Sequence, residues 1–252
     1  MFTAYLLLTA WAFASSAAVD PPPQGSPKSE TVTGSRLPVA AGDLPFTNSL
    51  PGRIFSAPIS DSDRESYSVA EKFGACLVKA DPSSSMAFVM AAPGSGASQV
   101  ARQKLKPFME RCFTTSVDQF IVGEISMTIQ PTMARGVIAE ALYRLQFADR
   151  PQPTQHISIT VPASERDEAI VYEFAQCVTD ANPASVRALI LSKVSSHEEQ
   201  SAISALMPSL SPCLYKGQTL KTDRLAFRAR LAESLYRWSV SAGQSVAAAE
   251  QP

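Results

Sequence analysis

The chain has 252 residues, of which 45% are hydrophobic and 18% are charged, and its formal net charge at pH 7 is −1. This apolar content is sufficient for a packed core, which excludes wholesale disorder. The near-zero net charge also excludes bulk attraction to nucleic acid or to an anionic membrane as the main basis of function.

An apolar leader begins the sequence. The run from Tyr5 to Phe13 is too short to span a bilayer, and Ser16 and Ala18 place small side chains at the −3 and −1 positions of a cleavage site. We therefore predict a signal peptide over 1–18 and a periplasmic or secreted protein with no stable membrane span after cleavage. No Lys or Arg precedes the run, so an uncleaved anchor or a core helix stays open as an alternative.

The composition divides the remainder into five segments. Proline, glycine and serine dominate 19–62, which predicts a disordered linker, and 242–252 has the same character and is expected to be a disordered tail. Between them we predict two helical units over 63–149 and 166–241. The segment 150–165 joins the units and contains alternating apolar residues that suggest a short strand.

An internal duplication is the strongest pattern in the sequence. Three blocks recur in the same order: FGACLVKADP (73–82) and FAQCVTDANP (174–183), LKPFMERC (105–112) and LMPSLSPC (206–213), RGVIAEALYRL (135–145) and RARLAESLYRW (228–238). The first two pairs are 101 residues apart and the third is 93 apart, so the first copy carries an eight-residue insertion around IVGEISMTIQ. Such self-similarity indicates a repeated supersecondary unit.

The predicted fold class is all-α, with about four helices in each unit and at most a few short strands. Asp81-Pro82 and Asn182-Pro183 each have an N-cap residue followed by proline, so one helix ends near residue 80 or 181 and another begins at once. Ser196 with the glutamate three residues later forms a capping box for the third helix, which Pro107 or Pro208 should kink or end. The third pair of blocks lies in the fourth and longest helix.

The four cysteines predict two local disulfides, Cys76–Cys112 and Cys177–Cys213, because both pairs have the same separation in an exported chain. A zinc site or a redox pair would need closely spaced cysteines, which the sequence lacks. Closing each loop is expected to stabilise its unit by roughly 3.5–4 kcal/mol on the chain-entropy model.

We predict no catalytic, cofactor-binding or metal-binding residues. The two histidines, His156 and His197, do not occupy equivalent positions, and His197 lacks the second histidine of a metalloprotease helix. The glycine-rich segment at 93–98 lacks the lysine of a phosphate loop and is better interpreted as a connection between helices.

The candidate binding surface comes from residues shared by the two copies on the helix face expected to lie away from the core. These residues are Glu140, Tyr143, Arg144, Glu233, Tyr236 and Arg237. Two explanations stay open: a docking surface for a partner or an anionic ligand, or a central helix that is buried on both sides. Lys221, Arg224 and Arg228 share another face, which we expect to be solvated rather than to bind nucleic acid.

The combined pattern of Cys-x4-Asp/Asn-Pro, a second cysteine and Ala-Glu-x-Leu-Tyr-Arg resembles that of exported bacterial proteins of uncharacterised activity, over about residues 67–240. The resemblance implies a periplasmic or secreted destination and no particular activity. We expect a non-enzymatic module that binds a protein or small-molecule partner. The alternatives are an envelope-associated hydrolase with a dispersed site and a self-associating structural component.

Overall fold

The computed structural model describes the backbone of residues 32–33, 61–116, 131–151, 166–220, 222 and 224–249. Within these ranges the elements are β1 (Val32–Thr33), α1 (Asp61–Ala80), α2 (Pro82–Met90), α3 (Gly96–Ser116), α4 (Pro131–Phe147), α5 (Arg166–Ala181), α6 (Pro183–Leu191), α7 (His197–Cys213), β2 (Thr219–Leu220) and α8 (Arg224–Ala249). The predicted all-α class with four helices in each unit is confirmed. We call α1–α4 unit 1 and α5–α8 unit 2.

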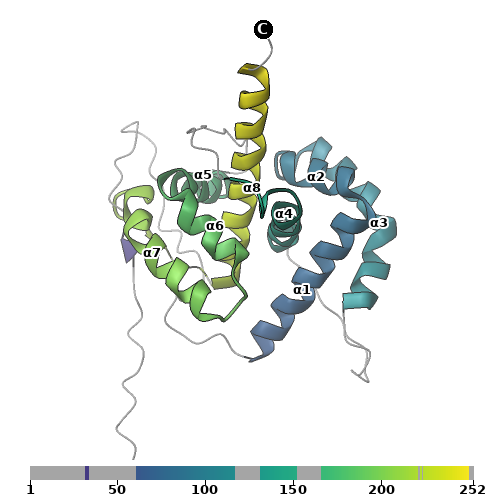
Figure 1. Ribbon diagram of the computed structural model, residues 1–252, viewed down its shortest axis with the longest axis horizontal. Coiled ribbons are helices and arrows are strands. Elements are labelled where there is room, and N and C mark those ends of the chain that lie inside the picture. The colour runs from purple at the N-terminus through teal and green to yellow at the C-terminus, as the bar shows by residue number, and fades with distance from the viewer. Residues whose placement is uncertain are drawn as a thin grey trace, which may run out of the picture.

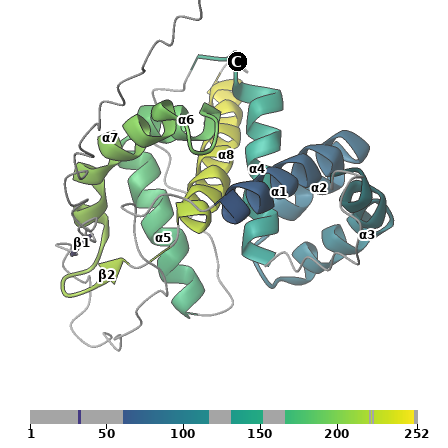
Figure 2. The ribbon, with the colours of Figure 1, turned by 90° about the horizontal axis from the view of Figure 1, so that it is seen from below.

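Helices α4 and α8 lie side by side in the middle of the molecule, with α1–α3 on one side and α5–α7 on the other (Figures 1 and 2). They form the most extensive helix–helix contact, and α1 and α5 pack on their outer faces. Positions up to the second cysteine of each unit correspond at an offset of 101 residues, as Cys76 does to Cys177. Positions in α4 and α8 correspond at an offset of 93, as Arg135 does to Arg228.

The second helix of each unit begins as predicted. The Asp81 carboxylate accepts a hydrogen bond from the backbone N–H of Ser84 at 2.9 Å, and the Asn182 side chain accepts one from Ser185 at 3.1 Å. Proline follows each cap, where the missing N–H costs the helix no internal hydrogen bond. Local sequence therefore fixes the corner between the first and second helices.

The third helices do not end at their prolines, because α3 continues through Pro107 and α7 through Pro208. Of the predicted alternatives, a kink or an end, the end is therefore wrong. Buried side chains lie on both sides of each proline, such as Leu105 and Cys112 in α3, so tertiary packing outweighs the lost backbone hydrogen bond. The predicted cap of α7 is confirmed, since the Ser196 side chain accepts a hydrogen bond from the backbone N–H of Glu199 at 3.2 Å.

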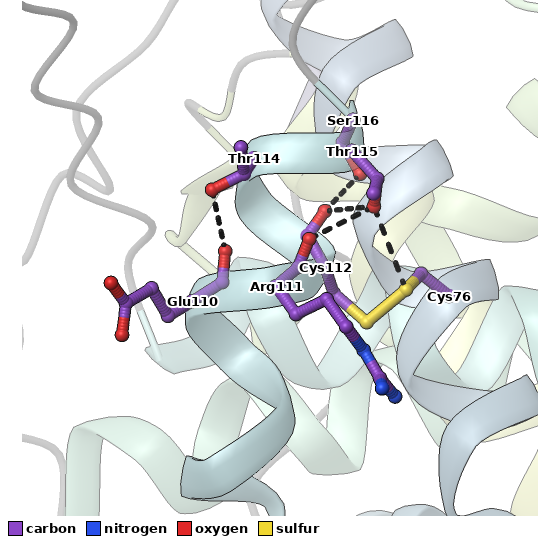
Figure 3. Close-up of a disulfide and its surroundings, with 7 residues drawn as sticks. All are labelled: Cys76, Glu110, Arg111, Cys112, Thr114, Thr115 and Ser116. Atoms are coloured by element: carbon purple, nitrogen blue, oxygen red, sulfur yellow. Dashed lines mark hydrogen bonds between the residues drawn. A yellow bond between two sulfur atoms is a disulfide. The ribbon is translucent and has the colours of Figure 1, made fainter.

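Both predicted disulfides are confirmed. The Cα atoms are 5.5 Å apart in Cys76–Cys112 and 5.6 Å apart in Cys177–Cys213. Figure 3 shows the first bridge joining α1 to the last turns of α3, where Thr115 lies beside the Cys76 sulfur. Each bridge therefore joins the first helix of a unit to its third.

Several predicted boundaries need correction. The predicted disordered linker over 19–62 overlaps regular structure at two places, because α1 begins at Asp61 and Val32–Thr33 pairs antiparallel with Thr219–Leu220. The tail over 242–252 was also expected to be disordered, but α8 continues to Ala249 because its alanine-rich end favours helix.

Other predictions fall outside the described residues. These are the leader over 1–18, the insertion around IVGEISMTIQ and the strand expected within 150–165. No helix in the described part of the chain is both long and apolar enough to cross a bilayer.

One continuous hydrophobic core spans both units. It includes Leu77 and Leu142 of unit 1 together with Leu189 and Leu235 of unit 2, all with 0% exposure. Since α4 and α8 contact helices of their own unit and also each other, they are buried on more than one face. Because of this central position, residues that the two units share on α4 and α8 can be buried on the face opposite the apolar stripe.

Candidate functional site

Five of the six residues predicted to form a binding surface are buried. Glu140, Tyr143, Glu233, Tyr236 and Arg237 are each at most 5% exposed, and only Arg144 lies partly at the surface. The prediction of a docking surface is therefore wrong for these five residues. The physical reason is that the face opposite the apolar stripe of each helix packs against the other unit rather than facing water.

Reciprocal ion pairs join the units. Arg135 of α4 donates to Glu233 of α8 through Nε at 3.0 Å and Nη2 at 2.6 Å. Arg228 of α8 donates to Glu140 of α4 through Nε at 3.1 Å and Nη2 at 2.7 Å. Each unit thus supplies an arginine to the glutamate of the other, as the two sides of a two-fold symmetric interface do.

The same arginines also satisfy carbonyl groups at the ends of the second helices. Arg135 donates to the carbonyls of Phe88, Val89 and Ala91 at 2.6–2.8 Å. Arg228 donates in the same way to the carbonyls of Ile190 and Ser192 at 3.1 and 2.8 Å. The last carbonyls of a helix lack partners within it and carry partial negative charge, so a buried guanidinium is well suited to them.

A tyrosine from the first helix completes each pair. The Tyr67 hydroxyl donates to Glu140 at 2.7 Å, and the Tyr172 hydroxyl donates to Glu233 at 3.0 Å. Burial and the adjacent carboxylate raise the pKa of both tyrosines, so the hydroxyls stay protonated and remain donors.

The two glutamates are held in the ionised form. Burial alone would raise the pKa of Glu140, but the attraction of Arg228 and Arg144 outweighs it, and the pKa lies below its ordinary value. The pKa of Glu233 is lowered for the same reason by Arg135 and Arg237, against the opposing effect of burial. Arg144 and Arg237 are the i,i+4 partners of these glutamates, at 2.7 and 3.2 Å.

The shared tyrosines of α4 and α8 contact the same aromatic ring. Tyr143 stacks on Phe147 with ring centroids 5.6 Å apart, and Phe147 meets the edge of Tyr236 at 6.0 Å. The contact of Phe147 with Tyr236 crosses between the units, whereas Tyr143 stacks on Phe147 within α4.

Gly136 marks the closest approach of α4 to α8. A Cβ at this position would lie 2.3 Å from the Cβ of Ala229, which is the corresponding residue of unit 2. Glycine is required here because the two backbones leave no room for a side chain.

The predicted solvated basic face is also wrong where it is described. Arg228 is fully buried and Arg224 is 12% exposed, and both bind the buried carboxylate of Glu199 at 3.0 and 2.9 Å. Lys221 lies outside the described residues.

A cavity of about 490 Å³ opens in unit 1, between α1, α3, α4 and the connection from α2 to α3. Its apolar floor contains Phe73, Leu77, Phe88 and Ile138. Ala134 forms part of one wall.

The polar groups of the cavity lie mainly along α3. They include Ser98, Gln99, Arg102 and Gln103. Cavities of this size, with an apolar lining and a few polar groups, are typical of small-molecule sites.

Two of the corresponding positions in unit 2 carry buried apolar side chains in place of a small and a charged one. Phe227 stands where unit 1 has Ala134, and its ring lies 6.4 Å from that of Phe174 with the side chain 3% exposed. Ile203, which is buried, stands where unit 1 has the exposed Arg102. Unit 2 therefore has a buried aromatic ring at the position where unit 1 has the small Ala134 side chain.

A polar difference accompanies the apolar ones. In unit 1, Arg135 Nη1 donates to the Ser98 hydroxyl at 3.3 Å. In unit 2, Arg228 Nη1 donates to the carboxylate of Glu199 at 3.0 Å, and Glu199 corresponds to Ser98. The cavity thus lacks a carboxylate that unit 2 has at the same place.

Sequence reasoning missed this cavity because it considered only the positions that are identical in the two copies. The sequence difference that indicates the cavity lies at two pairs of corresponding positions. These are Ala134 with Phe227 and Ser98 with Glu199. In the described ranges, no group of three or more His, Cys, Asp or Glu side chains is arranged to hold a metal ion.

Comparisons with known proteins do not assign a function. No protein-family model, no curated protein sequence and no solved structure matches the chain.

Proposed function

We propose that the protein is an exported, periplasmic or secreted, non-enzymatic binding module that arose by internal duplication, and that its ligand site is the cavity of unit 1. The apolar leader, the two disulfides and the resemblance to exported bacterial proteins support export. The repeated blocks, together with matching caps and bridges, support duplication.

One observation carries the proposed site: Ala134 lines an open cavity where the corresponding Phe227 of unit 2 is packed in the core. Two units with the same helices, caps and disulfides thus differ in whether this space is filled. In unit 2 a buried aromatic ring takes this position. In unit 1 a cavity large enough for a small molecule is open at the corresponding place. The buried ion pairs hold α4 against α8, so the cavity wall is fixed before a ligand binds.

The test uses a neutral fluorescent probe, N-phenyl-1-naphthylamine, with the full chain. We expect the probe to bind the wild type and Ala134→Phe to abolish that binding, because the new ring occupies the same space as Phe227 does in unit 2. Ala188→Phe is the matched control, since Ala188 is exposed on α6 and lies away from the cavity. It should bind the probe like the wild type.

A reciprocal variant sharpens the test. Phe227→Ala should create a second binding site in unit 2, observed as a doubled stoichiometry in a titration of folded protein. Absence of probe binding by the wild type, or equal binding by the wild type and Ala134→Phe, would contradict the proposed site. Circular dichroism melting curves would establish that each variant is folded.

A further inference from the structure

The differences between the units also indicate what kind of ligand the cavity takes. Unit 2 supplies two chemical groups at the corresponding place: the Phe227 ring and the Glu199 carboxylate. Unit 1 has Ala134 and Ser98 there, so both groups are missing together. A ligand that restores the packing and charge of unit 2 would bring a ring and an anion.

We propose that the cavity of unit 1 binds an aromatic acid, in which one ring-sized apolar group is joined to one anionic group. The inference rests on the proposed function, because it names the ligand class of that same site.

The apolar residues that line the cavity indicate the apolar part of the ligand. Phe73, Phe88 and Ile138 line it, and their counterparts Phe174, Leu189 and Leu231 are buried around the site in unit 2. Phe174 contacts the Phe227 ring at a centroid distance of 6.4 Å. A ligand ring beside Phe73 would make the corresponding contact and remove apolar surface from water.

The arginines at the site in each unit indicate the anionic part of the ligand. In unit 2, Glu199 lies between Arg228 and Arg224. In unit 1, Arg135 takes the place of Arg228 and donates its Nη1 hydrogen bond to the neutral Ser98 hydroxyl at 3.3 Å. Because a guanidinium binds a carboxylate more strongly than a hydroxyl, an anion at this position would improve the hydrogen bonding of Arg135.

Arg102 is a second cation in the cavity lining, and it lies on α3 rather than at the position that corresponds to Arg224 of α8. It lies one helical turn beyond Ser98 on α3 and lines the cavity, while its counterpart Ile203 is buried and apolar. Among the described residues, Arg102 has no ion-pair partner. The acid group of the ligand is therefore expected to lie between Arg102 and Ser98, with its ring toward Ala134.

The test compares two probes that share the same aromatic rings. 8-Anilino-1-naphthalenesulfonate carries an anionic group that N-phenyl-1-naphthylamine lacks. Fluorescence titrations of the wild type should give about tenfold tighter binding of the sulfonate. Arg102→Gln should remove this preference, so that the sulfonate binds no more tightly than the neutral probe.

Two further variants complete the design. Ser98→Glu places a carboxylate where Glu199 lies in unit 2, so it should weaken binding of the sulfonate by tenfold or more through repulsion. Lys106→Gln removes an exposed charge from the same helix outside the cavity lining, so it should leave the preference intact.

The outcomes separate the two proposals. Equal binding of the two probes, or a preference for the sulfonate that survives Arg102→Gln, would overturn the ligand class. If Ala134→Phe still abolished binding of both probes, the proposed site would stand. Binding of both probes that is insensitive to Ala134→Phe would overturn the site itself and the ligand class with it.

Discussion

Units 1 and 2 have the same helix order, caps and bridges, and they differ in the residues around the cavity. Both have a capped second helix, a disulfide from the first helix to the third, and an arginine that binds a glutamate of the other unit. They differ around the cavity, where Ala134 and Ser98 in unit 1 stand against Phe227 and Glu199 in unit 2. The identical arginines and glutamates therefore lie at the contact between the units, whereas Ala134 and Ser98, which differ from their counterparts, lie at the candidate site.

The arginine pairs give the largest expected difference between the units. Among the described residues, Arg228 binds two buried carboxylates, Glu140 and Glu199, whereas Arg135 binds one, Glu233. Removing one partner of a buried ion pair costs roughly 3–5 kcal/mol, because a charge is left in the core without its partner. We expect Arg228→Met to lower the free energy of unfolding by about 5 kcal/mol and Arg135→Met by about 3 kcal/mol.

Urea denaturation of both variants at pH 7 measures this difference. If Arg135→Met lowered the free energy of unfolding as much as Arg228→Met does, or more, the number of bound carboxylates would not set the loss. That result would contradict the expected difference between the units.

The disulfides are expected to have nearly equal effects. Each bridge closes a loop with a sequence separation of 36 residues. Replacing Cys76 and Cys112 together by alanine, or Cys177 and Cys213 together, should therefore lower the free energy of unfolding by roughly 3.5–4 kcal/mol in either case. Denaturation of the two double variants under oxidising conditions tests this, and a difference above about 1 kcal/mol would show that the units depend unequally on their bridges.

Gly136 and Ala229 provide the smallest of these effects. Gly136→Ala would place a Cβ 2.3 Å from the Ala229 side chain and so force α4 and α8 apart. We expect a loss of about 1–3 kcal/mol, as for other overpacked contacts. Thermal melting of Gly136→Ala and of the double variant Gly136→Ala/Ala229→Gly measures it, since the second change should restore part of the loss. A single variant as stable as the wild type would contradict the close approach.

The features predicted from sequence are those fixed by local chemistry. The Asp81-Pro82 corner depends on the capping preference of these two residue types, which the sequence alone gives. The disulfide pairing depends on the equal spacing of the cysteines, which the sequence also gives. The ends of α3 and α7 were not predicted, because packing around Pro107 and Pro208 outweighs the local preference.

The burial of the shared polar residues could not be predicted, because it depends on contacts between the units. A helical projection assumes one apolar face and one solvated face, so it placed Tyr143 toward water although the side chain is 1% exposed. Arginine and glutamate are rarely buried unless they are paired, and the partners of Arg135 and Arg228 lie in the other unit. The cavity depends on α1, α3 and α4 together, so only a comparison of the differing positions could have indicated it.

A crystal structure of the wild-type protein with 8-anilino-1-naphthalenesulfonate tests the central claim most directly. We expect the dye in unit 1, with an aromatic ring between Phe73 and Ala134 and its sulfonate within hydrogen-bonding distance of Arg102, and no dye at the Phe227 position of unit 2. An empty unit 1 cavity, with the dye bound elsewhere or not at all, would contradict the account.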